Sequence, residues 1–134
     1  MRARMLAKIP QTLLGALGIE LTLLEKDCVQ GRMPVDARTH QPMGLLHGGA
    51  SVALAESLAS IAGNLNLDPE KEYAVGLEIN ANHLKSARSG WVTGSAKPIH
   101  IGRRTQVWSV EIHNENGEML CISRCTLAVV AVKS

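Results

Sequence analysis

The sequence predicts an α+β fold in which one long central helix is wrapped by an antiparallel sheet of five to six strands. Three features of the 134 residues lead to this prediction. A mostly apolar run fills residues 48–65, apolar and polar residues alternate repeatedly after Tyr73, and an Asn-Gly pair at 116–117 separates two extended runs. The length is that of one domain, so we expect residues 1–134 to form a single unit.

The first half of the chain is predicted to hold a short helix, two strands and a loop before the long helix. Residues 10–17 have an amphipathic pattern that ends at Gly18. Residues 19–36 are typical of two short strands around a Glu-Lys-Asp turn, and residues 35–47 lack any periodicity, which predicts a loop. Pro69 prevents the long helix from continuing through the turn that follows it.

After Tyr73 the chain is predicted to be extended. Gly94 and Pro98 interrupt the second of the expected strands, which should therefore be bulged or bent. The last strand is apolar on both faces near its end, and this predicts that a second subunit covers the outer face of the sheet. The four expected strands cover residues 74–83, 90–102, 105–113 and 119–132.

The composition is that of a globular protein with an unusual core. Hydrophobic residues make up 46% of the chain and charged residues 19%, but phenylalanine is absent and only three residues are aromatic. Small and branched aliphatic side chains must therefore fill the interior. The net charge of +2, with no basic run interleaved with aromatic residues, argues against a nucleic-acid partner.

The chain has no feature of a secreted or membrane-bound protein. Its three cysteines are odd in number and form no Cys-x-x-Cys pair, which is typical of free thiols in a reducing cytosol. The N-terminus lacks the apolar segment and cleavage site of a signal peptide, and the long helix contains Glu56 and three serines. We therefore expect a cytoplasmic protein with no membrane partner.

Glu56 stands in the middle of the most apolar helix. An unpaired carboxylate in a protein interior costs several kcal/mol or has a raised pKa, so it needs compensation. Ser60 lies four residues later on the same helix face. Two interpretations are open: Glu56 is a functional carboxylate, or it lies at the helix edge and is satisfied by backbone or serine donors.

The residues His47, Gly48 and Gly49 come directly before this helix. A helix N-terminus exposes unpaired N–H groups and partial positive charge, which suits a developing oxyanion. The alternative is that the glycines only start a tightly packed helix. Glu56 lies about 12 Å from Gly48 along the helix axis. One helix cannot present both to the same atom, whereas two antiparallel copies can, and this predicts a site shared between subunits.

Other chemistries find no matching motif. The histidines show no His-Glu-x-x-His spacing, the serines lack a Gly-x-Ser-x-Gly elbow, and no phosphate-binding loop is present. We therefore expect no metal. Basic side chains between residues 85 and 104 form a group that could bind a pyrophosphate and a terminal phosphate, or that only solvates a hairpin end. They are Lys85, Arg88, Lys97, His100, Arg103 and Arg104.

Three segments together resemble the hotdog-fold acyl-CoA thioesterases. They are MPVDARTHQPMGLLHGGASVALAES (33–57), VGLEINANHLKSARSG (75–90) and GRRTQVWSVEIHNENG (102–117). The closest resemblance is to the 4-hydroxybenzoyl-CoA thioesterase-like branch with Glu on the helix. That branch includes 1,4-dihydroxy-2-naphthoyl-CoA hydrolases, of menaquinone biosynthesis, and proofreading thioesterases that act on aryl carrier proteins. The resemblance runs from about Gly31 to the C-terminus, and the first thirty residues match poorly.

The resemblance implies a hotdog fold and hydrolysis of acyl-CoA thioesters with aromatic acyl groups. It implies that Glu56 acts as a nucleophile or as a general base, and that the Gly48 N–H of the facing subunit polarises the carbonyl. Gln41 and His47 would line the same pocket, and Ser60 would position water or the carboxylate. Coenzyme A would be held by Gly76, His83, Leu84, Lys85, Ser86, His100, Ile101, Gly102, Arg103, Arg104 and Thr105.

The same resemblance implies a homo-oligomer, a dimer of dimers with shared sites, and no cofactor beyond the coenzyme A thioester that is the substrate. Two alternatives remain at this point: a proofreading thioesterase acting on an acyl carrier protein, and a non-catalytic acyl-CoA binding module. Met43 stands where the family often has an aromatic residue, so the acyl preference is expected to differ.

Overall fold

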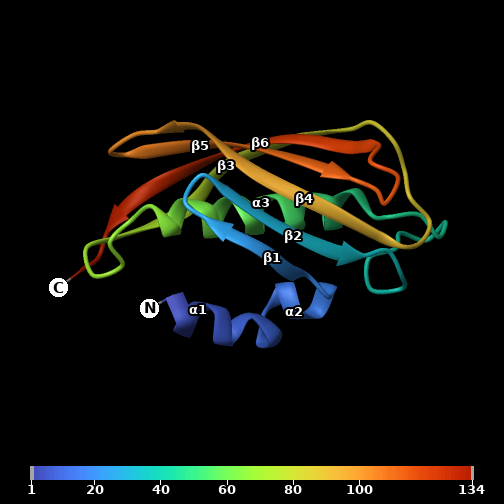
Figure 1. Ribbon diagram of the computed structural model, residues 1–134, viewed down its shortest axis with the longest axis horizontal. Coiled ribbons are helices and arrows are strands. Elements are labelled where there is room, and N and C mark those ends of the chain that lie inside the picture. The colour runs from blue at the N-terminus through green and yellow to red at the C-terminus, as the bar shows by residue number, and fades with distance from the viewer. Residues whose placement is uncertain (1, 134) are drawn as a thin grey trace.

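In the computed structural model, which describes residues 2–133, a curved six-stranded sheet wraps around one long helix (Figure 1). The helical elements are α1 (Arg2–Lys8), the 3₁₀ helix η1 (Ile9–Gln11), α2 (Leu13–Leu17) and α3 (Gly48–Leu65). The strands are β1 (Glu20–Glu25), β2 (Cys28–Pro34), β3 (Glu72–His83), β4 (Trp91–Ile101), β5 (Thr105–His113) and β6 (Met119–Ala131). This architecture confirms the predicted α+β fold class.

The sheet is antiparallel throughout, in the order β1-β2-β4-β5-β6-β3. The long strand β3 therefore lies at an edge and pairs only with β6. The β4 strand shifts register between Pro98 and His100, which confirms the predicted interruption, and β3 shifts register between Gly76 and Glu78. At the predicted Asn-Gly hairpin, Gly117 has a φ of 79°, in the left-handed region that favours glycine.

The helix predicted over residues 10–17 is wrong in its extent. The chain forms η1 over residues 9–11, then breaks at Thr12, and α2 begins only at Leu13. Thr12 is extended, with a φ of −115° and a ψ of −176°, and Pro10 is accommodated at the start of the 3₁₀ helix. A further helix, α1, precedes this region. Gly18, with a φ of 74°, ends α2 as a left-handed cap, as the sequence indicates.

The core lies between α3 and the concave face of the sheet. Leu54, Ala55, Leu58 and Ala59 of the helix are fully buried, as is Trp108 of β5. The contact is close because small residues face the helix: a Cβ on Gly94 would lie 2.7 Å from Cδ1 of Leu58. This is the small-residue core that the composition predicts.

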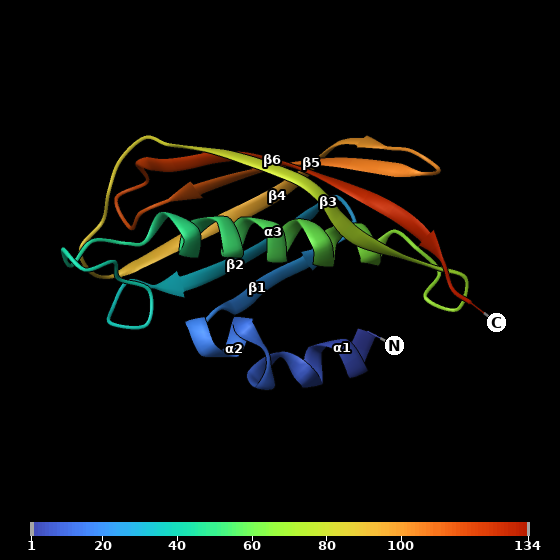
Figure 2. The same cartoon turned by 180° about the vertical axis from the view of Figure 1, so that it is seen from behind.

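The N-terminal segment, residues 2–17, runs antiparallel to α3 along the side of the helix that the sheet leaves open (Figure 2). Met5 lines a cavity with Asn64 and Leu65 at the end of α3. Leu13 and Leu17 line another with Gly49 and Ala53, near its start. The segment therefore forms a third layer, over the face of α3 that carries Glu56.

Across residues 2–133, none of the helices combines the length and the hydropathy needed to cross a bilayer.

Candidate active site

Glu56 lies half-buried on α3, with its carboxylate directed at the edge strand β3. A Cβ placed on Gly76 would lie 2.1 Å from Oε2 of Glu56, so only glycine leaves room for the carboxylate here. The β3 strand also shifts its register at this point, between Gly76 and Glu78. Such an irregularity bends the strand locally. The carboxylate therefore occupies a space formed by a glycine and a strand irregularity.

Asn64 ties α3 to β3 close to this contact. Its Oδ1 accepts a hydrogen bond from the backbone N–H of Ala74 at 2.9 Å, and its Nδ2 donates to the carbonyl oxygens of Ala74 at 3.1 Å and Ser60 at 2.8 Å. The amide thus pairs with the strand as a neighbouring strand would. Because Ala74 lies two residues before Gly76, Asn64 fixes the distance between the carboxylate and the strand.

No group within residues 2–133 donates a hydrogen bond to the Glu56 carboxylate or forms an ion pair with it. Cys125 of β6 is affected by the negative charge of Glu56. Burial is the main cause that raises the pKa of the Cys125 thiol to about 11, and the charges of Glu56 and Glu78 add to it. The structure thus decides against a carboxylate satisfied by backbone or serine donors within this part of the chain. Glu56 is left with open acceptor positions.

A cavity of about 700 Å³, here called the Glu56 chamber, adjoins this carboxylate. Ser60 lines it as well, in agreement with the shared helix face that the sequence indicates. The rest of its wall is formed by α3 and by the N-terminal segment, through Arg4, Met5, Lys8, Ile9, Thr12, Leu14, Ser57 and Ile61.

The start of α3 presents a free backbone donor. His47 is the extended N-cap residue, and its Nδ1 accepts a hydrogen bond from the N–H of Gly49 at 2.8 Å. The N–H groups of Ala50 and Ser51 bond to the His47 carbonyl. Within the described residues the N–H of Gly48 has no acceptor. A substrate oxygen at this helix N-terminus would meet an unpaired donor.

Gly48 lines a second cavity, of about 440 Å³, here called the Gly48 pocket. Gly48 packs against His83: a Cβ on Gly48 would lie 3.1 Å from the Nε2 atom. The pocket brings together the predicted residues Gln41, Gly48, His83, Leu84, Lys85 and Ser86. The Oε1 atom of Gln41 accepts the backbone N–H of Met43, which holds the loop before α3 in place.

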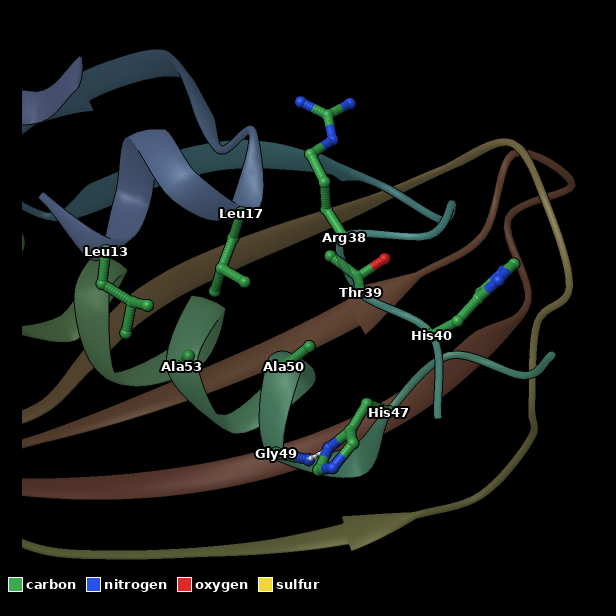
Figure 3. A pocket seen from close by; sticks show the side chains of 9 residues that line it. All are labelled: Leu13, Leu17, Arg38, Thr39, His40, His47, Gly49, Ala50 and Ala53. Carbon is green, nitrogen blue, oxygen red and sulfur yellow. Dashed lines mark hydrogen bonds between the residues drawn. The ribbon is translucent and has the colours of Figure 1, made fainter. Parts of the chain in front are cut away.

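His47 does not line the Gly48 pocket. His47 lines a cavity of about 280 Å³ together with Leu13, Leu17 and Arg38, and its ring lies next to Gly49 at the start of α3 (Figure 3). Within this chain His47 and Gln41 line different cavities, and their place in one shared pocket stays a prediction. Met43 is 78% exposed and lines none of these cavities.

The two predicted coenzyme A segments lie at opposite ends of the sheet (Figure 1). The bend of residues 100–105 is closed by a hydrogen bond from the N–H of Gly102 to the Thr105 carbonyl at 2.9 Å, and Arg103 and Arg104 are exposed. Thr105 aligns with Ala128, which aligns with Val75, so this bend lies at the Glu56 end of β3. The segment His83–Ser86 follows the other end of the same strand.

Lys85 forms an ion pair with Glu118, and Lys85 is the main cause of the lowered pKa of that carboxyl group. Neither Glu118 nor Asn64 is predicted as a site residue from the sequence. Residues 2–133 contain no group of three or more His, Cys, Asp or Glu side chains that is arranged to hold a metal ion.

The chain therefore carries two separate groups of candidate site residues, here called half-sites. Glu56, Ser60, Gly76 and the 100–105 bend lie at one end, and Gln41, Gly48 and His83–Ser86 lie at the other. The first half supplies a carboxylate without a partner, and the second supplies an N–H without a partner. Together they have the groups needed to attack a carbonyl carbon and to stabilise its oxygen.

Comparison with known proteins agrees with this chemistry. Residues 43–121 match the family model described as the thioesterase superfamily. The chain is 52% identical over 118 residues to a 1,4-dihydroxy-2-naphthoyl-CoA hydrolase of Escherichia coli, covering 88% of this chain and 86% of that protein. It is 49% identical over 119 residues to the proofreading thioesterase EntH of Cronobacter turicensis, covering 89% of this chain and 86% of that protein.

The fold is also that of a solved thioesterase. The crystal structure of a thioesterase from Haemophilus influenzae superimposes with a TM-score of 0.93 at 44% sequence identity, covering 100% of this chain and 93% of that one. Family, fold and half-sites lead to one conclusion: the chain belongs to the thioesterase superfamily of hotdog proteins and is a thioester hydrolase.

Proposed function

We propose that the protein hydrolyses acyl-CoA thioesters with aromatic acyl groups, at sites that each combine the half-sites of two chains. One observation carries the proposal: the unpaired Glu56 carboxylate lies beside Gly76, and the unpaired Gly48 N–H lies beside His83, on the same edge strand. The carboxylate and the N–H lie too far apart to act on one carbonyl group in a single chain.

The free edge of β3 supports pairing with a second copy. Twelve residues of this strand have no neighbour on one side, and Val75 and Leu77 are exposed on it. An open edge of this length is a template for another strand. If two copies of β3 pair antiparallel about an axis at Asn80, the register shift between Gly76 and Glu78 brings Gly76 of one beside His83 of the other. Glu56 then meets the Gly48 N–H of the second copy.

In the proposed reaction the thioester carbonyl oxygen accepts the Gly48 N–H of one chain, and Glu56 of the other chain acts on the carbonyl carbon. The carboxylate attacks directly and forms a mixed anhydride that water then cleaves, or it takes a proton from the attacking water. In both cases the carbon–sulfur bond breaks, water supplies the hydroxyl group of the acid product, and the coenzyme A sulfur leaves as a thiol. Ser60 lies in the chamber where that water would bind. These steps require no cofactor.

The same pairing unites the two coenzyme A segments. It brings His83–Ser86 of one chain to the end of the sheet that carries the 100–105 bend of the other. Arg103 and Arg104 are exposed there and suited to phosphate groups. Lys85 contributes a third cation once a phosphate replaces Glu118 as its partner. A dimer of dimers would cover the exposed Ile122 on the outer face of the sheet.

The name of one relative supports an aromatic acyl group on coenzyme A, and the name of another leaves a second carrier to compare. One is a 1,4-dihydroxy-2-naphthoyl-CoA hydrolase and the other a proofreading thioesterase. We favour coenzyme A as the carrier here because exposed arginines lie at the Glu56 end of the sheet. A carrier-protein thioester is the second candidate, favoured by the relationship to the proofreading thioesterase.

Replacing Glu56 by Gln should lower kcat by about 10²–10⁴-fold, because the amide can neither attack the carbonyl nor accept a proton. Thiol release from 1,4-dihydroxy-2-naphthoyl-CoA and benzoyl-CoA, followed with a thiol reagent, measures this change. Circular dichroism should show an unchanged fold, since the two side chains are nearly isosteric. A variant that keeps wild-type turnover would remove Glu56 from the mechanism.

Replacing Gly76 by Ala should reduce turnover at least tenfold without lowering the unfolding midpoint. The added Cβ would lie 2.1 Å from Oε2 of Glu56, and the flexible carboxylate must move away from its position.

The matched control is Gly63→Ala, whose Cβ would lie 2.3 Å from Cδ1 of the buried Leu127 and 2.7 Å from Oε1 of Gln106. This variant should lose about 1–3 kcal/mol in urea unfolding, because the methyl overpacks the core. Equal stability losses in the two variants would show that Gly76 serves packing and not the position of Glu56.

Replacing Arg103 and Arg104 together by Ala should raise KM for coenzyme A esters about tenfold or more, with little change in kcat, because charge-assisted bonds to phosphate are lost. The same acyl group on N-acetylcysteamine, which has no nucleotide, is the control and should be cleaved as by the wild type. An unchanged KM for the coenzyme A ester would place the nucleotide elsewhere.

A further inference from the structure

The Glu56 chamber is closed on one side by the N-terminal segment. Met5, Ile9 and Leu14 supply apolar surface to the chamber, and Met5 also packs against the core. On the opposite side the chamber is lined by Glu56, Ser60 and Ile61 of α3. An acyl group that enters the chamber from Glu56 therefore meets the apolar side chains of the N-terminal segment.

A further cavity, here called the end cavity, lies beyond this chamber along α3. It measures about 480 Å³ and is predominantly apolar. It is lined by Met5, Asn64, Leu65, Leu67, Pro69, Glu72, Tyr73 and Ala74. The helix residues of the chamber end at Ser60 and Ile61, and those of the end cavity begin one turn later at Asn64.

Met5 is the residue of α1 that lines both spaces. Its unbranched side chain therefore contributes to the wall of the chamber and to the wall of the end cavity. Methionine adapts its shape at little cost and fills irregular gaps. The partition between the two cavities thus depends on one flexible side chain.

We propose that Met5 sets the depth of the acyl-binding site, and that the end cavity is its extension for acyl groups with a long apolar tail. The proposal rests on the proposed function, because it takes Glu56 as the group that acts on the thioester. It assigns a role in specificity to the N-terminal segment, which touches neither the carbonyl group nor coenzyme A.

The chemistry of the end cavity favours an apolar occupant. Among its polar side chains, Asn64 already uses its oxygen and its nitrogen in hydrogen bonds to Ala74 and Ser60, and Glu72 carries a negative charge that disfavours an anionic tail. Leu65, Leu67 and Tyr73 supply the surface that an alkyl or extended aryl tail would bury. A tail carrying charged groups would find no free partner on Asn64 and would lose its hydration.

The test compares 4-methylbenzoyl-CoA with 4-hexylbenzoyl-CoA, which share the reacting ring and differ only in the tail. In Met5→Ala the ratio of kcat/KM for the hexyl ester to that for the methyl ester should rise about tenfold, the effect of burying roughly two more methylene groups. In Met5→Phe the ratio should fall. Leu6→Ala is the matched control, since Leu6 is the next residue of α1 and lines neither cavity. Its ratio should stay at the wild-type value.

Calorimetric binding of non-hydrolysable thioether analogues of the two esters separates this proposal from the proposed function. If the wild type binds the analogues but cleaves neither ester, the proposed function fails. The role of Met5 is then still decided by binding, through the ratio of the dissociation constants of the methyl and hexyl analogues in Met5→Ala and in the wild type. A ratio equal to that of the wild type in both assays would overturn the proposal. An equal rise in Leu6→Ala would also overturn it, since general loosening of α1 would then be the cause.

Discussion

The proposed function depends on a carboxylate that the chain holds in place without a hydrogen-bond or ion-pair partner within residues 2–133. Glu56 is half-buried on α3 and has no donor within the described residues. A carboxylate removed from water without a hydrogen-bond partner costs free energy, and neighbouring structure must fix it if it is to stay. Here Gly76 provides the space, and Asn64 ties the strand to the helix. In the proposed dimer, the second chain completes the site around this carboxylate.

The position of β3 in the sheet explains how this can happen. Because β3 lies at the edge, it presents free backbone groups along its length, and the two half-sites lie near its two ends. A strand in the middle of the sheet would keep the half-sites apart permanently. In the proposed dimer, the open edge instead lets one antiparallel pairing unite the carboxylate, the helix N-terminus and both proposed coenzyme A segments. The proposed oligomer and its chemistry thus follow from the strand order of the fold.

Periodicity and turn chemistry predict the long helix, the extended second half and the hairpin at Asn116-Gly117. A single charged residue in an apolar helix is enough to single out Glu56 as a candidate site residue. The N-terminal helices were predicted less well, because Pro10 permits a 3₁₀ turn and the break at Thr12 has no strong pattern in the sequence. Asn64 and Glu118 act through contacts with distant residues, which neither spacing nor composition records. His47 caps α3 by accepting the N–H of Gly49, a local role that the His-Gly-Gly sequence alone does not specify.

The central claim, that each site combines Glu56 of one chain with Gly48 of another, is tested most directly by a mixed dimer of two inactive variants. One is Glu56→Gln. The other is Gly48→Pro, which removes the N–H at the first helical position, where proline is tolerated and where the extended His47 already suits it. Co-expression with two different tags and sequential affinity purification isolates the mixed dimer. If sites are shared, it contains one intact site and should recover about half of the wild-type activity. A mixed dimer as inactive as its parents would contradict the account.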